Sequence, residues 1–166
     1  EKAVMTDVVK LLGGTFDAPL SLDSSSPEVL EAALRIYPGR ALINSISQER
    51  HKLEKLLPIA AKYGAMFILL PLSDEGVPEK AAKRMEIVRN VFAEAQAYGF
   101  RKCDIVVDGL VMTVSSNQEA AAETLDLIEW CSRDFGCNTI VGLSNVSFGL
   151  PERSWINAAF LSMAVG

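Results

Sequence analysis

One alternation repeats along the chain and limits the folds that it can adopt. Five short apolar runs each lead into a longer segment with apolar residues at helical spacing, and each run is expected to form a buried strand. The runs are 18–22, 41–46, 66–71, 104–107 and 138–143. Strict alternation of this kind predicts parallel strands joined by crossover helices, in a doubly wound sheet or a closed (βα) barrel.

The segments between these runs carry helix start and stop signals. Ser26 and Pro27 supply a cap and a first helical position, and Pro38 with Gly39 ends that helix. Three more helices end at glycines: 48–63 at Gly64, 78–98 at Gly99, and a helix capped by Asn117 that runs through Trp130 at Gly136. The glycine stops fall in step with the strand starts, so the predicted order is β-α throughout.

Polar residues follow all five runs, at the carboxyl end of each predicted strand. They are Asp23, Asn44, Ser73 with Asp74, Asp108, and Ser144 with Asn145. A barrel gathers its strand ends around one mouth, whereas an open sheet spreads several of them away from its crevice. The pattern therefore favours a (βα)8 TIM barrel, here an incomplete one of about five consecutive βα units.

The number of units is below that of a whole barrel. Residues 1–13 are expected to be the end of a preceding helix and 152–166 a closing helix. An eight-stranded barrel normally needs about 200 residues or more. We expect residues 1–166 to be one domain that lacks two strands at its N-terminal side and one at its C-terminal side.

Composition excludes several classes of function. A net charge of -5 and a pI near 4.9 make a nucleic-acid partner improbable. Three cysteines without CxxC spacing predict neither a disulfide framework nor a metal site, and fit a reducing cytoplasm. No apolar run approaches the roughly 20 residues of a membrane span, and the one histidine, His51, excludes any scheme that needs a histidine pair.

The segment GLSNVSFGLPER at 142–153, followed by SWINAAFLSMA, is the most distinctive stretch. It resembles the folate domain of cobalamin-dependent methionine synthase and its relatives, the methyltetrahydrofolate:corrinoid methyltransferases. PLSLDS at 19–24, LINSIS at 42–47 and VVDGL at 106–110 resemble further strands of that pterin-binding family, in the right order. The resemblance spans the whole chain.

This resemblance implies an activity and a set of residues. The N5 methyl group of 5-methyltetrahydrofolate would pass to cob(I)alamin or another corrinoid held by a separate domain or protein, as a step of methionine synthesis. Asp23, Asn44 and Asp108 match the family's pterin-contacting positions, and carboxylates suit the N–H edge of the ring. Asn145 matches the family's asparagine at N5, where a hydrogen bond would stabilise the transition state. Ser144, Ser147 and Gly142 are lesser candidates for lining the ring.

Local explanations remain open for these residues. Asp23 could cap the helix that follows it, the serines and asparagines of 142–153 could satisfy their own loop, and Arg153 is expected to be a surface residue. The alternative functions are a corrinoid iron-sulfur protein methyltransferase, a dihydropteroate synthase-like enzyme, and a catalytically inert pterin-binding fragment. Unpaired strand edges would also favour a homodimer.

Overall fold

A computed structural model describes residues 1–166. Helices and strands alternate along the chain as α1 (Lys2–Thr15), β1 (Ser21–Asp23), α2 (Pro27–Ile36), β2 (Leu42–Ser47), α3 (Arg50–Tyr63), β3 (Met66–Leu70), α4 (Ala81–Ala97), β4 (Ile105–Asp108), α5 (Ala120–Trp130), β5 (Asn138–Ile140) and α6 (Arg153–Val165). Short turns of helix precede β4 (η1, Lys102–Asp104), follow α5 (η2, Cys131–Phe135) and follow β5 (η3, Leu143–Asn145). The predicted α/β class with alternating βα units is confirmed.

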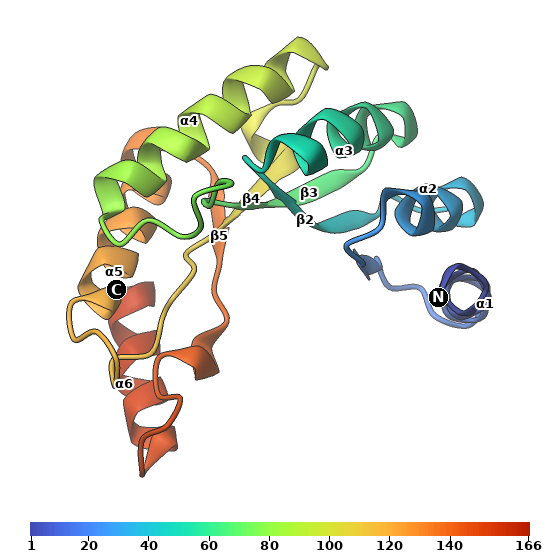
Figure 1. The fold of residues 1–166 in the computed structure, drawn as a ribbon. Helices are drawn as coiled ribbons and strands as arrows, with labels where there is room; N and C mark the ends of the chain where they lie inside the picture. The colour runs from blue at the N-terminus through green and yellow to red at the C-terminus, as the bar shows by residue number, and fades with distance from the viewer.

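The five strands form one parallel sheet in the order β1-β2-β3-β4-β5. Each strand pairs with the next in sequence, as in a barrel wall. The sheet curves into an arch, with helices along its outer side and the strands within (Figure 1). Because all strands run in the same direction, their carboxyl ends lie along one edge of this arch.

Local sequence explains where the helices begin and end. Ser26 caps α2 by accepting a hydrogen bond from the amide of Val29, and Pro27 occupies the first turn. Gly64 ends α3 and Gly136 ends η2, both in the left-handed conformation that glycine adopts without strain. These stops match the sequence predictions.

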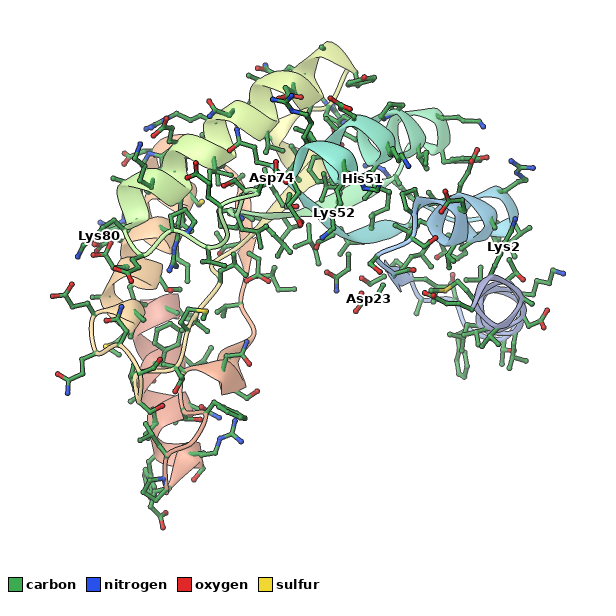
Figure 2. The ribbon with its side chains drawn as sticks, viewed as in Figure 1. Lys2, Asp23, His51, Lys52, Asp74 and Lys80 are labelled. Carbon is green, nitrogen blue, oxygen red and sulfur yellow. The ribbon has the colours of Figure 1, made fainter.

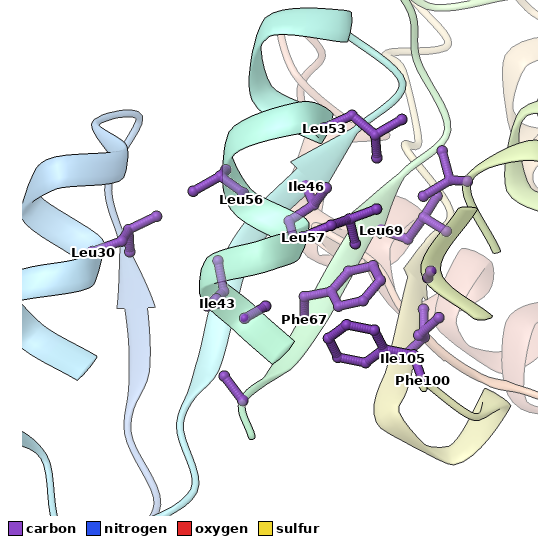
Figure 3. Packing of buried hydrophobic residues seen from close by; sticks show 14 of the residues in the cluster. Leu30, Ile43, Ile46, Leu53, Leu56, Leu57, Phe67, Leu69, Phe100 and Ile105 are labelled. Atoms are coloured by element: carbon purple, nitrogen blue, oxygen red, sulfur yellow. The ribbon is translucent and has the colours of Figure 1, made fainter. Parts of the chain in front are cut away.

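The main core lies between the sheet and the helices on its outer side. Phe67 and Leu69 of β3 are fully buried and pack with Ile43 and Ile46 of β2 (Figure 3). The rings of Phe67 and Phe100 meet edge to face, with centroids 5.2 Å apart. This packing fixes the middle strands and thereby the loops at their carboxyl ends.

The strands differ from the predicted ones at three places. The first strand is only Ser21–Asp23, and the last ends at Ile140 because Leu143–Asn145 turn into a short 3-10 helix. Asn44 is the third residue of β2, which continues to Ser47, and so does not end its strand. None of the helices is long and apolar enough to cross a membrane.

Candidate pterin site

Asp23 and Asn44 lie side by side on the first two strands. They are direct partners in the β1-β2 register, and the Asn44 side-chain amide donates to the Asp23 carboxylate at 3.4 Å. Asp23 is exposed on the inner side of the arch (Figure 2). Asn44 thus orients the carboxylate weakly and leaves it free to accept further hydrogen bonds. Asp23 makes no capping bond to α2, whose cap is Ser26.

Asp108 is the last residue of β4, and its carboxylate is half-buried. One oxygen, Oδ1, accepts a hydrogen bond from the amide of Leu110 at 2.8 Å. Burial raises the pKa of Asp108 above its usual value, and the Leu110 amide offsets only part of this effect. Leu110 has a positive φ of 47°, a conformation that favours glycine, so the turn that presents Asp108 is locally strained.

A buried arginine stabilises this turn by hydrogen bonds to its backbone. Arg84 of α4 is 1% exposed, and its Nη1 donates to the carbonyls of Gly109 and Leu110 at 3.2 and 3.3 Å and to Thr124 Oγ1 at 3.3 Å. Its Nε donates to the carbonyl of Pro78 at 2.7 Å. The guanidinium therefore bonds to neutral oxygens and leaves the Asp108 carboxylate without a cationic partner.

Asn145 lies in the 3-10 turn that follows β5. Its backbone amide donates to the carbonyl of Gly142 at 3.0 Å, and its side chain is exposed and makes no hydrogen bond within the chain. A β-carbon added at Gly142 would lie 3.0 Å from Asn145 Nδ2. Glycine at 142 therefore lets the Asn145 amide fold closely over the backbone.

Ser147 and Arg153 stabilise this loop from within. The fully buried Ser147 hydroxyl donates to Asn157 Oδ1 at 2.7 Å and accepts from Arg153 Nε at 3.0 Å. Arg153 Nη2 also donates to the carbonyl of Ser144 at 2.7 Å. The Ser147 hydroxyl is thus engaged inside the loop, whereas the Ser144 side chain and Gly142 are exposed at its surface.

The loops that carry Asp108 and Asn145 are joined to each other. The amide of Val114 donates to the carbonyl of Val146 at 3.0 Å, and Thr113 Oγ1 donates to the carbonyl of Phe148 at 2.6 Å. Val146 packs with Val111 and with Phe160 of α6 in a second, small apolar cluster. Movement of either loop is therefore coupled to the other.

The structure thus forms two groups of site residues on one edge of the sheet. Asp23 and Asn44 make the first, and Asp108 and Asn145 sit on the connected loops of the second. No hydrogen bond joins the two groups. A hollow of about 650 Å³ lies elsewhere, among α3, α4 and the loop after β3. Ser73 and Asp74 line it, whereas none of the residues predicted to contact the pterin does.

Sequence reasoning did not find Arg84 or the bond between Val114 and Val146. Arg84 left a signal, because it falls on the same face of α4 as the buried Ile87, Val88 and Val91. A charged residue at such a position must find several hydrogen-bond partners when it is buried. The bond from Val114 joins two irregular loops and leaves no periodic pattern.

Comparisons with known proteins identify the family of the chain. The sequence profile of the family described as pterin binding enzyme matches residues 1–166. The chain is 31% identical to a methionine synthase of Mycobacterium tuberculosis over 96% of its length, and 30% identical to the methylcorrinoid:tetrahydrofolate methyltransferase of Eubacterium limosum over 98%. The chain therefore belongs to the pterin-binding enzyme family.

Solved structures of dihydropteroate synthases share the fold. One from Yersinia pestis, with a pterine-sulfa conjugate, superposes on 99% of the chain with a TM-score of 0.72 and 21% identity. One from Thermus thermophilus covers 98% of the chain, with a TM-score of 0.66 and the same 21% identity. The chain spans 14% of the M. tuberculosis relative, 60% of the E. limosum relative and 65% of the Y. pestis chain.

Proposed function

We propose that this domain binds 5-methyltetrahydrofolate and takes part in transfer of its N5 methyl group to a corrinoid, as a cytoplasmic step of methionine synthesis. One observation carries the proposal: Asp108 offers a half-buried carboxylate, without a cationic partner, at the carboxyl edge of a pterin-binding fold. A pterin ring presents ring N–H and amine donors, which a carboxylate accepts as charge-assisted hydrogen bonds. Burial makes such bonds stronger than they are in water.

The remaining residues would orient the ring and assist its reaction. Asp23 and Asn44 would contact the pterin from the neighbouring strands, and Gly142 and Ser144 would line the ring. Asn145 would donate a side-chain hydrogen bond to N5 as that nitrogen becomes the leaving group, which stabilises the transition state more than the bound substrate. Ser147 would act as a positioning residue, because its hydroxyl holds the Asn145 loop.

A corrinoid bound by its own domain or protein would supply cobalt(I), the nucleophile. The role of this chain is then to hold the pterin so that its methyl group faces that partner, and to stabilise the departing nitrogen. None of the predicted roles requires a nucleophilic side chain, which agrees with the amide and carboxylate groups found along this edge of the sheet.

The direction of transfer defines a second candidate. The E. limosum relative is named as a methylcorrinoid:tetrahydrofolate methyltransferase, the reverse reaction. The same hydrogen bond from Asn145 would serve both directions, because they share one transition state. The partner that delivers or accepts the methyl group would decide the net direction, and a corrinoid iron-sulfur protein is a further partner of this kind.

A dihydropteroate synthase-like reaction would need cationic groups for a pyrophosphate. The arginine of the loop after β5, Arg153, is already bonded to Ser147 and to the carbonyl of Ser144. Arg153 is therefore engaged within its own loop, and the cationic groups for a pyrophosphate would have to come from elsewhere in the full-length protein.

Calorimetry and a methyl-transfer assay test the proposal in the full-length protein that contains these residues. Asp108→Asn is expected to weaken methyltetrahydrofolate binding about 10- to 100-fold, the equivalent of charged hydrogen bonds worth about 1.5–3 kcal/mol. Asn145→Ala is expected to slow methyl transfer to free cob(I)alamin by a factor on the order of 10² to 10³ with a much smaller loss of binding.

Matched variants control for general damage. Asp126→Asn changes an exposed aspartate on α5, and Asn138→Ala changes an exposed asparagine at the amino end of β5. Both are expected to bind and react normally. Full-length protein that binds no folate would refute the function, and normal binding without any transfer would support the inert pterin-binding alternative.

A further inference from the structure

Two cysteines meet where α5 turns into β5. Cys131 begins the η2 turn, and Cys137 directly precedes β5. The amides of Gly136 and Cys137 both donate to the carbonyl of Cys131, at 2.8 and 3.0 Å. A disulfide needs α-carbons about 4.4–6.8 Å apart, and a direct backbone hydrogen bond between the two residues is compatible with that spacing.

The two thiols have different surroundings. Cys131 is fully buried in the main core, whereas Cys137 is half-buried and lines a hollow of about 280 Å³ with Cys103, Ser132 and Asn138. A small oxidant can therefore reach Cys137 but not Cys131. This is the arrangement of an attacking thiol with a resolving thiol behind it.

The pKa values of the two thiols are shifted in opposite directions. Hydrogen bonding to Cys131 lowers the pKa of Cys137, and the charge of Lys102 acts in the same direction against the effect of burial. The pKa of Cys131 is raised by the same hydrogen bond and by burial. Since the thiolate is the reactive form, Cys137 is the better nucleophile of the two.

We propose that Cys137 and Cys131 form an oxidisable dithiol that reacts with hydrogen peroxide. The Cys137 thiolate attacks one peroxide oxygen, the O–O bond breaks, and the departing hydroxide takes a proton and leaves as water. Cys131 then attacks the sulfur of the Cys137 sulfenic acid, whose hydroxyl leaves with the Cys131 proton as a second water. Two thiols are oxidised to one disulfide, and one peroxide is reduced to two waters.

The dithiol lies away from the proposed pterin residues. Cys137 precedes the amino end of β5, while Asn145 follows the carboxyl end of the same strand. The reaction is therefore independent of the proposed methyl transfer, and its test does not depend on folate binding.

Cys103 provides an internal comparison, because it lines the same hollow and is more exposed than Cys137. Its sulfur lies 3.8 Å from the Asp104 carboxylate, as a hydrogen-bond donor. If exposure alone decided reactivity, Cys103 would be oxidised first. The geometry of the dithiol predicts instead that Cys137 is oxidised before Cys103.

Peroxide treatment of the reduced full-length protein, followed by alkylation and peptide mapping by mass spectrometry, tests the proposal. The expected product is a Cys131–Cys137 disulfide that forms equally in Cys103→Ser. Cys131→Ser is expected to stop at a sulfenic acid on Cys137, which dimedone traps. Wild-type protein in which Cys103 is oxidised first, or in which Cys103 pairs with Cys137, would overturn the proposal even if the Cys131 variant fails to fold.

Discussion

Asp108 is the site residue whose ionised form is most disfavoured by its surroundings. Burial raises its pKa in the folded protein, so folding favours the protonated form. The associated stability is present below the unfolded-state pKa and is lost as the pH rises through the folded-state pKa. At neutral pH, the ionised carboxylate therefore lowers the free energy of unfolding.

Asp108→Asn is expected to raise the melting temperature at neutral pH while it weakens pterin binding. The asparagine oxygen can still accept the Leu110 amide, but it carries no charge to desolvate. Each 1 kcal/mol added to the free energy of unfolding raises the melting temperature by about 2–4 °C for a chain of this size. Thermal unfolding from pH 3 to 8 measures the effect, and the difference from wild type should shrink as Asp108 becomes protonated. A lower melting temperature at neutral pH would contradict this account.

Arg84 is expected to matter for the position of Asp108 as well as for stability. Arg84→Met would leave the carbonyls of Gly109 and Leu110 without their guanidinium partner, at a cost of about 1–3 kcal/mol for each buried group left unsatisfied. Urea unfolding measures this loss. Methyltetrahydrofolate affinity, measured where the variant remains folded, should fall as well. Unchanged affinity in a destabilised variant would limit Arg84 to a structural role.

The alternation of strands and helices singled out the four main site residues by their position at strand ends, but their individual roles came only from family resemblance. Asp23, Asn44, Asp108 and Asn145 lie in motifs of the family, and their roles remain predictions. The contacts of Arg84 that support the Asp108 turn could not be predicted. Arg84 donates to backbone carbonyls, and because every residue has a carbonyl, the sequence does not show which ones it will reach. The half-burial of Asp108 likewise depends on packing around the strand end, which periodicity does not describe.

At the scale of elements, Asp104 links the amino ends of β2 and β4. Its buried carboxylate accepts from Arg40 Nη2 at 2.7 Å and from the amide of Arg101 at 2.8 Å. Arg40 lies two residues before β2, and Asp104 directly precedes β4. The Arg40 hydrogen bond is the largest cause that lowers the pKa of Asp104, to about 2.

Asp104→Asn is expected to destabilise the protein by about 1–3 kcal/mol, less than a fully buried ion pair would, because the Arg40 side chain is half-exposed. The contribution of the carboxylate is present above its unfolded-state pKa and is lost as the pH falls from about 4 toward 2. Urea unfolding at pH 7 and at pH 3 measures the loss of stability and its dependence on pH. Asp134→Asn, at an exposed aspartate of η2, is the matched control. If Asp104→Asn lowered the free energy of unfolding equally at both pH values, the ionised carboxylate and its pair with Arg40 would not be the cause.

Element order was predictable, whereas several element ends were not. Glycines such as Gly64 and Gly136 mark stops by their backbone freedom, which is a property of the residue itself. The start of α4 at Ala81 instead of residue 78 depends on Glu123 of α5, whose carboxylate accepts the Ala81 amide at 2.6 Å. Such a contact between distant residues fixes a boundary that local patterns leave open.

At the scale of the whole molecule, the barrel prediction and the observed sheet agree as far as five strands. The neighbour order β1-β2-β3-β4-β5 is that of a barrel wall, and β1 and β5 are its two edges. Neither edge has a strand partner. The chain spans 60% of the E. limosum protein. The prediction that two strands are lacking on one side and one on the other stays a prediction.

These edges are accompanied by apolar residues on the terminal helices. On α6, Trp155 is 74% exposed and Val165 is 79% exposed, and Leu161 and Met163 are exposed as well. At the other end of the chain, Val4 and Leu11 of α1 and the following Phe16 are exposed as well. Apolar groups beside an unpaired edge strand favour association with another chain.

The 166-residue chain on its own is therefore expected to self-associate as its concentration rises. Sedimentation velocity over a series of concentrations measures this. Leu161→Lys with Met163→Lys should shift the chain toward the monomer, because charges on that face of α6 oppose contact between copies. Glu86→Lys, at an exposed position on α4 away from both edges, controls for the change in net charge. A chain that stays monomeric at every concentration would mean that the exposed edges are stable in water, and the homodimer prediction would then be wrong.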